Sequence, residues 1–551
     1  MILNFNKRLF TALVFGITLF FLFVEYTFFS SDVITRGEKL GTTGGYDYDN
    51  ADNDGGSDWC SRVAGRRYID DFASTWTISC DGSDERRDVR GGMVCFQSQI
   101  EEEPDNFCVA RNAVYSSTPI PVSKEDLFPE HGILPLGADG GEKVNTRPSR
   151  PYKRDTELPR VQPRQSLPWN PWASQWSLDC SSKKEWAYGV QPPFKFRSYF
   201  SETGVGPQLR WFDMKQRKKQ QHDQDLERTD GAVQVNGEGT VAKECKESIM
   251  LVKLEGGGNI WHTLMEVWSA VLTLDILKRA AEAKEHLFGS TGKEGGVWEE
   301  DSITIYIQEN MQSEMDASPV FGLWDVVTGK DVKDVKELKD GCYKSVILPL
   351  AGGANPFWKD HWKERNCERS SLVDGFVGKV MKFYGVEDAP AAVKGADAEE
   401  QERVKIRIIG RQHNRKILRL FDYIKTLQTT YPDADIEITK LERLDVTEQL
   451  RMMRKTDILI GVTGAGLTHT MFLRKGAAVV ELTQPEPFTY FGFGNIAKMR
   501  GIEYFAVHGQ KREGKSSINW QEDNVLVDER ALVEVVGKAI EGQKRRKGIG
   551  S

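Results

Sequence analysis

Two residues with the spacing of an acid–base pair stand in the middle of this 551-residue sequence, His262 and Glu266. They lie four positions apart, so a helix over residues 260–278 would place them on one face. An imidazole and a carboxylate at that spacing could remove a proton from an attacking hydroxyl group. The alternative is an ordinary i, i+4 pair on a helix surface.

Arg411 and Arg415 directly follow an apolar run at residues 404–409. Arginine binds phosphate oxygens through two parallel hydrogen bonds, which lysine cannot do. If the run is a strand, both guanidinium groups lie at its carboxyl end, at the start of a helix. They could then neutralise a diphosphate leaving group. Pairing with local carboxylates is the other interpretation.

A glycine-rich turn, Thr463-Gly464-Ala465-Gly466-Leu467, follows a second apolar run at 458–460. A turn that opens a helix leaves N–H groups at the positive end of the helix dipole, which suits a phosphate. The spacing is that of a Walker loop, but Leu467 stands where that loop needs lysine. The dinucleotide fingerprint is also incomplete, because His469 takes the place of its third glycine. A glycine-rich connection without a ligand is the alternative.

These residues require alternating strands and helices to position them. The first expected series is strand 249–254, a turn with Asn259 as N-cap, helix 260–278, strands 303–307 and 342–350, and helix 368–384. The second is strand 404–409, helix 415–430, strand 434–439, helix 447–455, strands 458–460 and 477–482, and a final helix 526–542. Such alternation predicts an α/β protein with two Rossmann-like halves that face each other across a cleft. Ligands bind at the carboxyl ends of parallel strands, where Glu481 also lies.

Composition limits the function classes. The chain is 39% hydrophobic and 28% charged with a net charge of −7. That is enough for two or three domains with cores of their own. The mild acidity argues against a nucleic-acid-binding protein.

An apolar segment near the N-terminus predicts a membrane anchor. Residues 9–29 are mostly apolar and approach the length that a bilayer requires, about 20 residues. Lys7 and Arg8 precede the segment, which keeps the N-terminus cytosolic. Bulky Phe28 and Phe29 stand where a cleavage site needs small residues, so an uncleaved anchor is favoured over a signal peptide.

The eight cysteines agree with a lumenal location. None forms a C-x-x-C pair, so a zinc site is not indicated. An even number in an oxidising compartment predicts disulfides of unknown connectivity, with buried free thiols as the alternative. The sequence contains no N-x-Ser/Thr sequon, so we expect no N-glycan.

The order of these motifs resembles glycosyltransferase family 61. The resemblance is carried by Asp457–His469, Gly258–His262 with Glu266, Ile408–Arg411 with Arg415–Leu418, Tyr431–Leu450 and Ala477–Leu482. It extends over about residues 245–510.

Membership would imply an inverting, GT-B-type transferase that uses a UDP-sugar. Arg411 and Arg415 would hold the diphosphate, the Gly464–Leu467 loop would support the nucleotide, and Glu481 would contact ribose. His262 or Glu266 would act as the base, since a single displacement needs only one. The other substrate-binding residues of the matched motifs would be Asn259, Thr463, Ala465, Gly466 and His469.

The expected organisation follows from the resemblance and the composition together. The segments are a cytosolic tail (1–8), a transmembrane anchor (9–29), a flexible stem (30–58), a cysteine-containing and proline-rich region (59–180), a Rossmann-like acceptor-side domain (181–388), a linker (389–402), a nucleotide-sugar-binding domain (403–525), and a terminal helix with a disordered basic tail (526–551). The C-terminus is not a KDEL-type signal, so a single-pass type II protein of the Golgi membrane is expected, with the ER membrane as the alternative.

One position departs from the family pattern. The family commonly has histidine where this chain has Thr463, and a hydroxyl can donate a hydrogen bond but cannot carry charge. Two functions therefore stay open. The first is transfer of N-acetylglucosamine or xylose to a glycoprotein or glycan; the second is an inactive binding or scaffold protein of the same fold. No acidic metal motif is present, so we expect turnover without a cofactor or a divalent ion.

Overall fold

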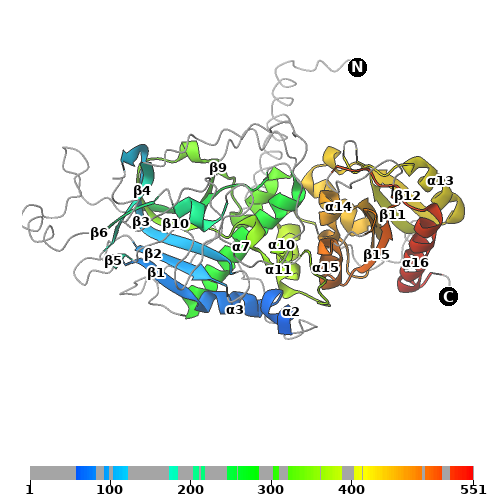
Figure 1. The fold of residues 1–551 in the computed structure, drawn as a ribbon, viewed down its shortest axis with the longest axis horizontal. Helices are drawn as coiled ribbons and strands as arrows, with labels where there is room; N and C mark the ends of the chain where they lie inside the picture. Colours follow the sequence, from blue (N-terminus) through cyan, green and yellow to red (C-terminus); the bar gives the residue numbers. More distant parts are fainter. Residues whose placement is uncertain are drawn as a thin grey trace, which may run out of the picture. The chain divides into compact units, whose positions relative to one another are not determined.

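The structure is a computed structural model that describes residues 58–81, 92–98, 104–121, 173–180, 182–183, 203–209, 212–216, 245–256, 259–283, 302–308, 320–359, 361–386, 403–411, 414–486, 490–511 and 522–549. All of these ranges belong to one unit, residues 51–551. The predicted anchor at 9–29, nearly all of the stem and the linker at 389–402 lie outside the described residues. The predicted α/β class is confirmed, because two sheets alternate with helices (Figure 1).

The C-terminal half contains a sheet of five described strands in the order β12-β11-β13-β14-β15, and every neighbouring pair is parallel. The strands are β11 (Val404–Ile409), β12 (Ala434–Thr439), β13 (Ile458–Val462), β14 (Ala478–Thr483) and β15 (Glu503–His508). The helices are α13 (Leu420–Thr430), η7 (Leu441–Arg443), α14 (Val446–Lys455), η8 (Ala465–Phe472), α15 (Gly492–Met499) and α16 (Glu529–Lys547). Strands β13 and β14 are buried along their whole length, as expected for a sheet covered on both faces.

The first sheet is mixed and has ten described strands. Eight follow the order β5-β1-β2-β3-β10-β7-β8-β9, while β4 pairs with β3 and β6 pairs with β4. The strands are β1 (Trp76–Asp81), β2 (Gly92–Gln97), β3 (Asn106–Pro121), β4 (Ala173–Cys180), β5 (Ser182–Lys183), β6 (Phe212–Gln216), β7 (Lys246–Val252), β8 (Ile303–Ile307), β9 (Lys333–Asp334) and β10 (Gly341–Leu348). Strands β10, β7, β8 and β9 are parallel, whereas β3 joins β10 antiparallel. This sheet therefore differs from the wholly parallel one that a Rossmann-like half would have.

The first part contains one long apolar helix, α7 (Ile260–Ala283). The others are α2 (Asp58–Val63), α3 (Arg66–Ser74), α5 (Val205–Leu209), η4 (Phe321–Trp324), α9 (Asp325–Thr328), η5 (Val335–Glu337), η6 (Gly352–Ala354), α10 (Pro356–Lys359) and α11 (Ser371–Phe383). Trp268 of α7 is buried and stacks on Phe357 and Phe376, with ring centroids 4.2 and 5.2 Å away. Among the described residues, Ile260–Glu282 has the length and apolar character of a membrane span, but 83% of its most apolar window is buried inside the protein.

Contacts join the segment before the linker to the C-terminal half. Asp374 of α11 pairs with Arg500 and, at 2.8 Å, with Lys475. The backbone N–H of Ser370 donates to the carbonyl of Met499 at 3.2 Å. These bonds fix α11 against the end of α15.

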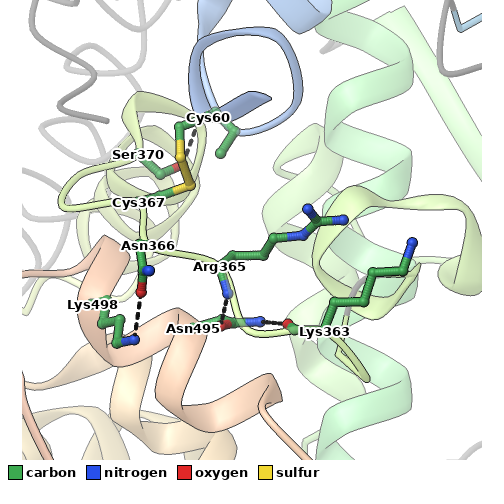
Figure 2. The surroundings of a disulfide bond; sticks show 9 residues. Cys60, Lys363, Arg365, Asn366, Cys367, Ser370, Asn495 and Lys498 are labelled. Carbon is green, nitrogen blue, oxygen red and sulfur yellow. Dashed lines mark hydrogen bonds between the residues drawn. A yellow bond between two sulfur atoms is a disulfide. The ribbon is translucent and has the colours of Figure 1, made fainter. Parts of the chain in front are cut away.

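The predicted disulfides are present, and no described cysteine is free. Bonds are formed by Cys60 with Cys367, Cys95 with Cys108 and Cys245 with Cys342. The first spans 307 residues and ties α2 to the segment before α11 (Figure 2).

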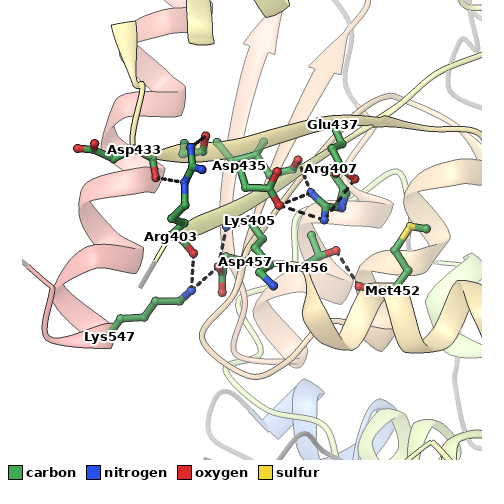
Figure 3. A network of polar contacts seen from close by, with 12 residues as sticks. Arg403, Lys405, Arg407, Asp433, Asp435, Glu437, Met452, Thr456, Asp457 and Lys547 are labelled. Carbon is green, nitrogen blue, oxygen red and sulfur yellow. Dashed lines mark hydrogen bonds and ion pairs between the residues drawn. The ribbon is translucent and has the colours of Figure 1, made fainter. Parts of the chain in front are cut away.

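Two predicted helices differ from the observed ones. The helix expected at 415–430 begins only at Leu420, because Arg415 and Arg419 have φ angles of 57° and 59°, outside the right-handed helical region. The tail Lys544–Lys547, expected to be disordered, is helical, and Lys547 Nζ contacts the buried carboxylate of Asp457 at 2.6 Å (Figure 3). Both differences arise from contacts distant in sequence.

Candidate anion-binding and catalytic site

The strand order of the C-terminal sheet defines where a ligand should bind. From β11 the chain moves outward to β12 and then returns to β13 on the other side of β11. Between β11 and β13 the connections therefore leave in opposite directions, and ligands bind in the crevice outside the carboxyl ends of such strands. Arg411 follows β11 and Thr463 follows β13, so both predicted groups stand at this point.

The structure brings the two arginines and the glycine turn together. Arg415 Nη1 donates to the carbonyl of Thr463 at 3.2 Å. Gly464 has a φ of 148°, and a methyl group built on it would lie 2.8 Å from Arg415 Cζ and 3.3 Å from Arg411 Nη1. A glycine is thus needed both for the backbone angle and for the approach of two guanidinium groups. The Nε group of Arg411 donates to the carbonyl of Asn414 at 3.0 Å, which orients that side chain.

Two cations held side by side create a strongly positive site. Burial, followed by the charge of Arg411, lowers the pKa of Arg415 to about 10. Burial also lowers the pKa of Arg411, which Glu442 opposes. A bound dianion would relieve the desolvation and the mutual repulsion, so this pair is suited to diphosphate.

Thr463 and Glu481 are bonded to each other inside the protein. The hydroxyl of Thr463 donates to Glu481 Oε1 at 2.6 Å, and the hydroxyl of Tyr504 donates to Oε2 at 2.8 Å. Glu481 is 0% exposed, and burial raises its pKa to about 7. Both of its oxygens already accept hydrogen bonds from protein groups in this structure.

The rest of the turn forms the start of η8, a 3-10 helix where an α-helix was expected. Ala465 and Gly466 are partly exposed and stand at its N-terminus, where a helix leaves backbone N–H groups without intrahelical partners. Leu467 is buried and packs next to Gly461, so only its backbone faces the turn.

His469 belongs to this helix, and its side chain is buried. Its ring nitrogens lie 2.9 Å from the carbonyl of Gly466 and 2.7 Å from Gln449 Oε1. Burial lowers the pKa of His469 to about 4, so the ring is neutral and holds the turn through α14. The buried imidazole therefore stabilises the conformation of the turn.

Helix α7 of the first part carries the predicted acid–base pair. Asn259 is its N-cap, because its Oδ1 accepts from the N–H of Trp261 at 3.0 Å. His262 is partly exposed, its ring packs edge-on against Trp358 with centroids 4.6 Å apart, and burial lowers its pKa to about 4. The imidazole is therefore neutral near pH 7 and can accept a proton.

Glu266 lies deeper, beneath the loop that follows β7. It is 4% exposed, and its Oε1 accepts from the backbone N–H of Glu255. Glu255 itself accepts from the hydroxyl of Thr203 at 2.5 Å and from the N–H of Gly353 at 3.0 Å, and burial raises its pKa to about 7. The carboxylate of Glu266 supports the loop at the end of β7.

A series of aromatic rings extends from His262 to Tyr490. The path runs from Trp358 to Trp261, Phe493 and Tyr490, with centroids 6.1, 5.5 and 5.4 Å apart. The pKa of Tyr490 is raised first by burial and then by the charge of Glu481, and Arg415 opposes this. Tyr490 is therefore within electrostatic reach of the anion site.

Sequence reasoning missed Glu255, Trp358, Tyr490 and Tyr504. Glu255 had a signal, because it directly follows the expected strand 249–254, and Glu481 likewise lies near the carboxyl end of its strand. The tyrosines had a weaker one in Gly492 and Gly494, which allow their rings to lie close to α15. Within the ranges that the structure describes, no group of three His, Cys, Asp or Glu residues could hold a metal ion.

Residues 354–480 match the sequence model of the family described as Glycosyltransferase 61, which confirms the resemblance drawn from the motifs. The matched range contains Arg411, Arg415 and the glycine turn but not α7.

The chain is also similar to proteins named EGF domain-specific O-linked N-acetylglucosamine transferase. It is 30% identical over 190 residues to the one from Drosophila melanogaster, 34% over 232 residues to that from Canis lupus familiaris and 36% over 186 residues to that from Mus musculus. These matches cover 34%, 38% and 33% of this chain and 32%, 42% and 33% of the relatives. The chain thus spans less than half the length of these relatives.

Proposed function

We propose that this protein is an inverting glycosyltransferase that moves a sugar from a UDP-sugar to a hydroxyl group of a glycoprotein or glycan. The observation that carries the proposal is the position of the Arg415 guanidinium, which lies against Gly464 and donates to the carbonyl of Thr463. Together with Arg411 it forms a dicationic site at the switch point of the sheet, inside the matched family range.

The chemistry that we assign to this site is stabilisation of the leaving UDP. Negative charge develops on the diphosphate as the bond to the sugar breaks. Pre-positioned guanidinium groups and the first N–H groups of η8 would stabilise it without reorganisation. They supply the positive charge that a metal ion would otherwise provide, so we infer that transfer needs no divalent ion.

Of the two candidate bases, we propose His262. Its neutral ring is partly exposed, whereas one oxygen of Glu266 accepts from a backbone N–H below the surface. His262 stands on α7 in the first part, and the aromatic path from Trp358 to Tyr490 leads from it to the anion site. This arrangement supports a GT-B-like enzyme, with the acceptor hydroxyl activated from one half and the donor held by the other.

We propose N-acetylglucosamine as the first donor sugar and a protein as the first acceptor, which the names of the relatives support, with xylose as the other donor. Disulfides that tie distant segments persist only in an oxidising compartment. They support a location in the secretory pathway, and we propose the Golgi membrane with the anchor at residues 9–29.

A pair of arginine variants tests the function. Arg415→Ala should abolish UDP binding and sugar transfer, because it removes half of the dicationic site. Arg419→Ala is the matched control, since Arg419 lies in the same turn with a similar φ but pairs with Asp422 and Glu529. UDP binding by calorimetry and transfer from UDP-N-acetylglucosamine and UDP-xylose, with and without a chelator, give the readout for the full chain. Equal UDP binding by both variants would show that Arg415 does not form a UDP-binding site.

The alternative function is a binding or scaffold protein. Thr463 favours this alternative, because its hydroxyl is bonded to Glu481 and cannot supply the positive charge of a histidine cation. That protein would bind UDP through Arg415 yet transfer no sugar from either donor to any glycoprotein acceptor.

A further inference from the structure

A buried network beneath the glycine turn connects three strands to the arginine site. Glu481 on β14 is register-paired with Gly461 on β13, so its side chain lies beside the end of that strand. Tyr504 on β15 donates to one carboxyl oxygen at 2.8 Å, and Thr463 donates to the other at 2.6 Å. The carboxyl group therefore joins β15 to the first residue of the turn.

Thr463 is held from three directions. Its N–H donates to the carbonyl of Leu482 at 3.1 Å, its hydroxyl donates to Glu481, and its own carbonyl accepts from Arg415 Nη1 at 3.2 Å. The carbonyl that receives Arg415 thus belongs to a residue whose side chain is fixed from below. A shift of Thr463 would move this acceptor and the neighbouring Gly464 together.

The space above the network is tight. A methyl group on Gly464 would lie 2.8 Å from Arg415 Cζ, so the turn and the guanidinium are in direct contact. Interiors packed in this way transmit small displacements instead of absorbing them. In metal sites, mutation of the groups that orient the ligands from behind changes affinity by about 10–100-fold, and we expect positioning groups to act in the same way here.

We propose that Glu481 and Tyr504 are positioning residues for the anion site, which act through the hydroxyl of Thr463 on the turn and on Arg415. The inference rests on the proposed UDP site and gives Glu481 a different role from ribose contact. It also gives Thr463 a function of its own at the position where the family commonly has histidine. Burial raises the pKa of Glu481 to about 7, and the hydrogen bonds from Thr463 and Tyr504 oppose this rise.

The test compares buried hydroxyls that do and do not belong to the network. Thr463→Val replaces the hydroxyl with a methyl group of similar size, and Tyr504→Phe removes the other donor to Glu481. Tyr423→Phe is the control, because its buried hydroxyl donates to the carbonyl of Val527 at 2.8 Å in the same half of the protein. UDP affinity is measured by calorimetry on the full chain, and melting temperature and circular dichroism report the fold.

We expect Thr463→Val and Tyr504→Phe each to weaken UDP binding about tenfold, as loss of one buried hydrogen bond allows. Tyr423→Phe should lower the melting temperature about as much as the two network variants do. Its Kd for UDP should stay within about twofold of the parent value. Thr463→Ser, which retains the hydroxyl, should recover most of the affinity that Thr463→Val loses.

The outcomes separate this inference from the proposed function. If the parent binds UDP and the two network variants bind it equally well while melting earlier, the network is only structural and the inference is wrong. If the parent does not bind UDP, the proposed function is wrong and the positioning role falls with it.

Discussion

Arg415 has a backbone conformation that is rare for its residue type. Its φ of 57° lies in the left-handed region, which costs a residue with a side chain about 1–2 kcal/mol. Such conformations persist where the surrounding structure enforces them, commonly at ligand sites. Here the N–H of Arg415 donates to the carbonyl of Glu522 at 3.4 Å and its guanidinium to Thr463. The angle turns the side chain back over the end of β13.

His262 makes a prediction about pH at the scale of one residue. Burial lowers its pKa from 6.5 to about 4, so the folded protein keeps the ring neutral down to about pH 4. Because the imidazole is already neutral at pH 5, its protonation state does not change between pH 5 and pH 7. Protonation of His262 should therefore lower kcat only below about pH 5. An acidic limb with an apparent pKa near that of an ordinary histidine, about 6.5, would contradict the assignment.

The lowered pKa of His262 also determines the direction in which stability changes with pH. Between about pH 6.5 and pH 4 the unfolded chain binds a proton at His262 that the folded chain does not bind. His262 therefore lowers the free energy of unfolding as the pH falls through this window. Urea unfolding of His262→Gln should show a weaker dependence on pH than the parent there, and His262→Gln should lower kcat about 100-fold or more.

The places of the candidate site residues in the fold were predictable where their signal was local. Arg411, Arg415 and Gly464 were found because a strand end followed by cations or glycines specifies a place in an α/β fold. The sequence could not show whether the side chain of Glu481 contacts a substrate or Thr463. The burial of this side chain depends on Tyr504 of the neighbouring strand. Side-chain depth follows from the packing of neighbouring strands, which periodicity does not report.

At the scale of elements, residues 361–370 form a strap between the first helices and α15. On one side Cys367 is bonded to Cys60, and the hydroxyl of Ser370 donates to the carbonyl of Ala64 at 2.5 Å. On the other side Asn495 accepts from the N–H of Arg365 and donates to the carbonyl of Lys363, both at 2.8 Å (Figure 2).

Other bonds extend the strap toward the anion site. Lys498 reaches Asn366 at 2.9 Å, and the N–H of Phe491 donates to the carbonyl of His361 at 2.8 Å. Phe491 is next to Tyr490, so the strap ends beside the residue that is in electrostatic reach of Arg415.

Removal of the long-range disulfide should loosen this strap. The double variant Cys60→Ser with Cys367→Ser should lose about 2–5 kcal/mol of stability and bind UDP more weakly. Cys95→Ser with Cys108→Ser is the control, because that bond joins register-paired residues of adjacent strands only 13 positions apart. Thermal unfolding and UDP calorimetry measure both effects. Equal UDP binding by the two double variants would show that the strap does not reach the site.

Element positions were predictable to within a few residues in the C-terminal half. Strands 404–409 and 434–439 coincide with β11 and β12. The antiparallel strands β1–β3 could not be placed in this sheet, because they join it through the pairing of β3 with β10, which links residues more than 200 positions apart. Mixed sheets of this kind depend on long-range register.

At the scale of the molecule, the last helix, α16, is bonded to the C-terminal sheet at the edge opposite to the arginine site. Asp457 precedes β13, is 1% exposed, and accepts from the N–H of Lys405 at 2.8 Å, from Arg474 at 2.5 Å and from Lys547 at 2.6 Å. Lys547 also donates to the carbonyl of Arg403 at 3.1 Å (Figure 3). The end of α16 is thus bonded to the beginnings of two central strands.

Two lysines of the tail should therefore differ in their effect on stability. Lys547→Met leaves a buried carboxylate with one cation fewer and should lower the free energy of unfolding by about 1–3 kcal/mol. Lys544→Met removes only an exposed ion pair with Asp433 at 3.7 Å and should change it by less than about 0.5 kcal/mol. Urea unfolding of both variants measures the difference, and equal losses would mean that the contact with Asp457 contributes nothing.

Strand β3 has a practical consequence for anyone who shortens this protein. It is hydrogen-bonded to β2 on one side and to β10 on the other, in registers that place Cys108 beside Cys95 of β2 and Leu348 of β10. A fragment that started between residue 122 and the beginning of β10 at Gly341 would leave β10 with a bare row of N–H and C=O groups on that side. Such edges recruit strands from other molecules, so that fragment would precipitate or form intermolecular sheets on expression. Secreted versions for crystallography or assays should accordingly keep everything from Asp58 onward.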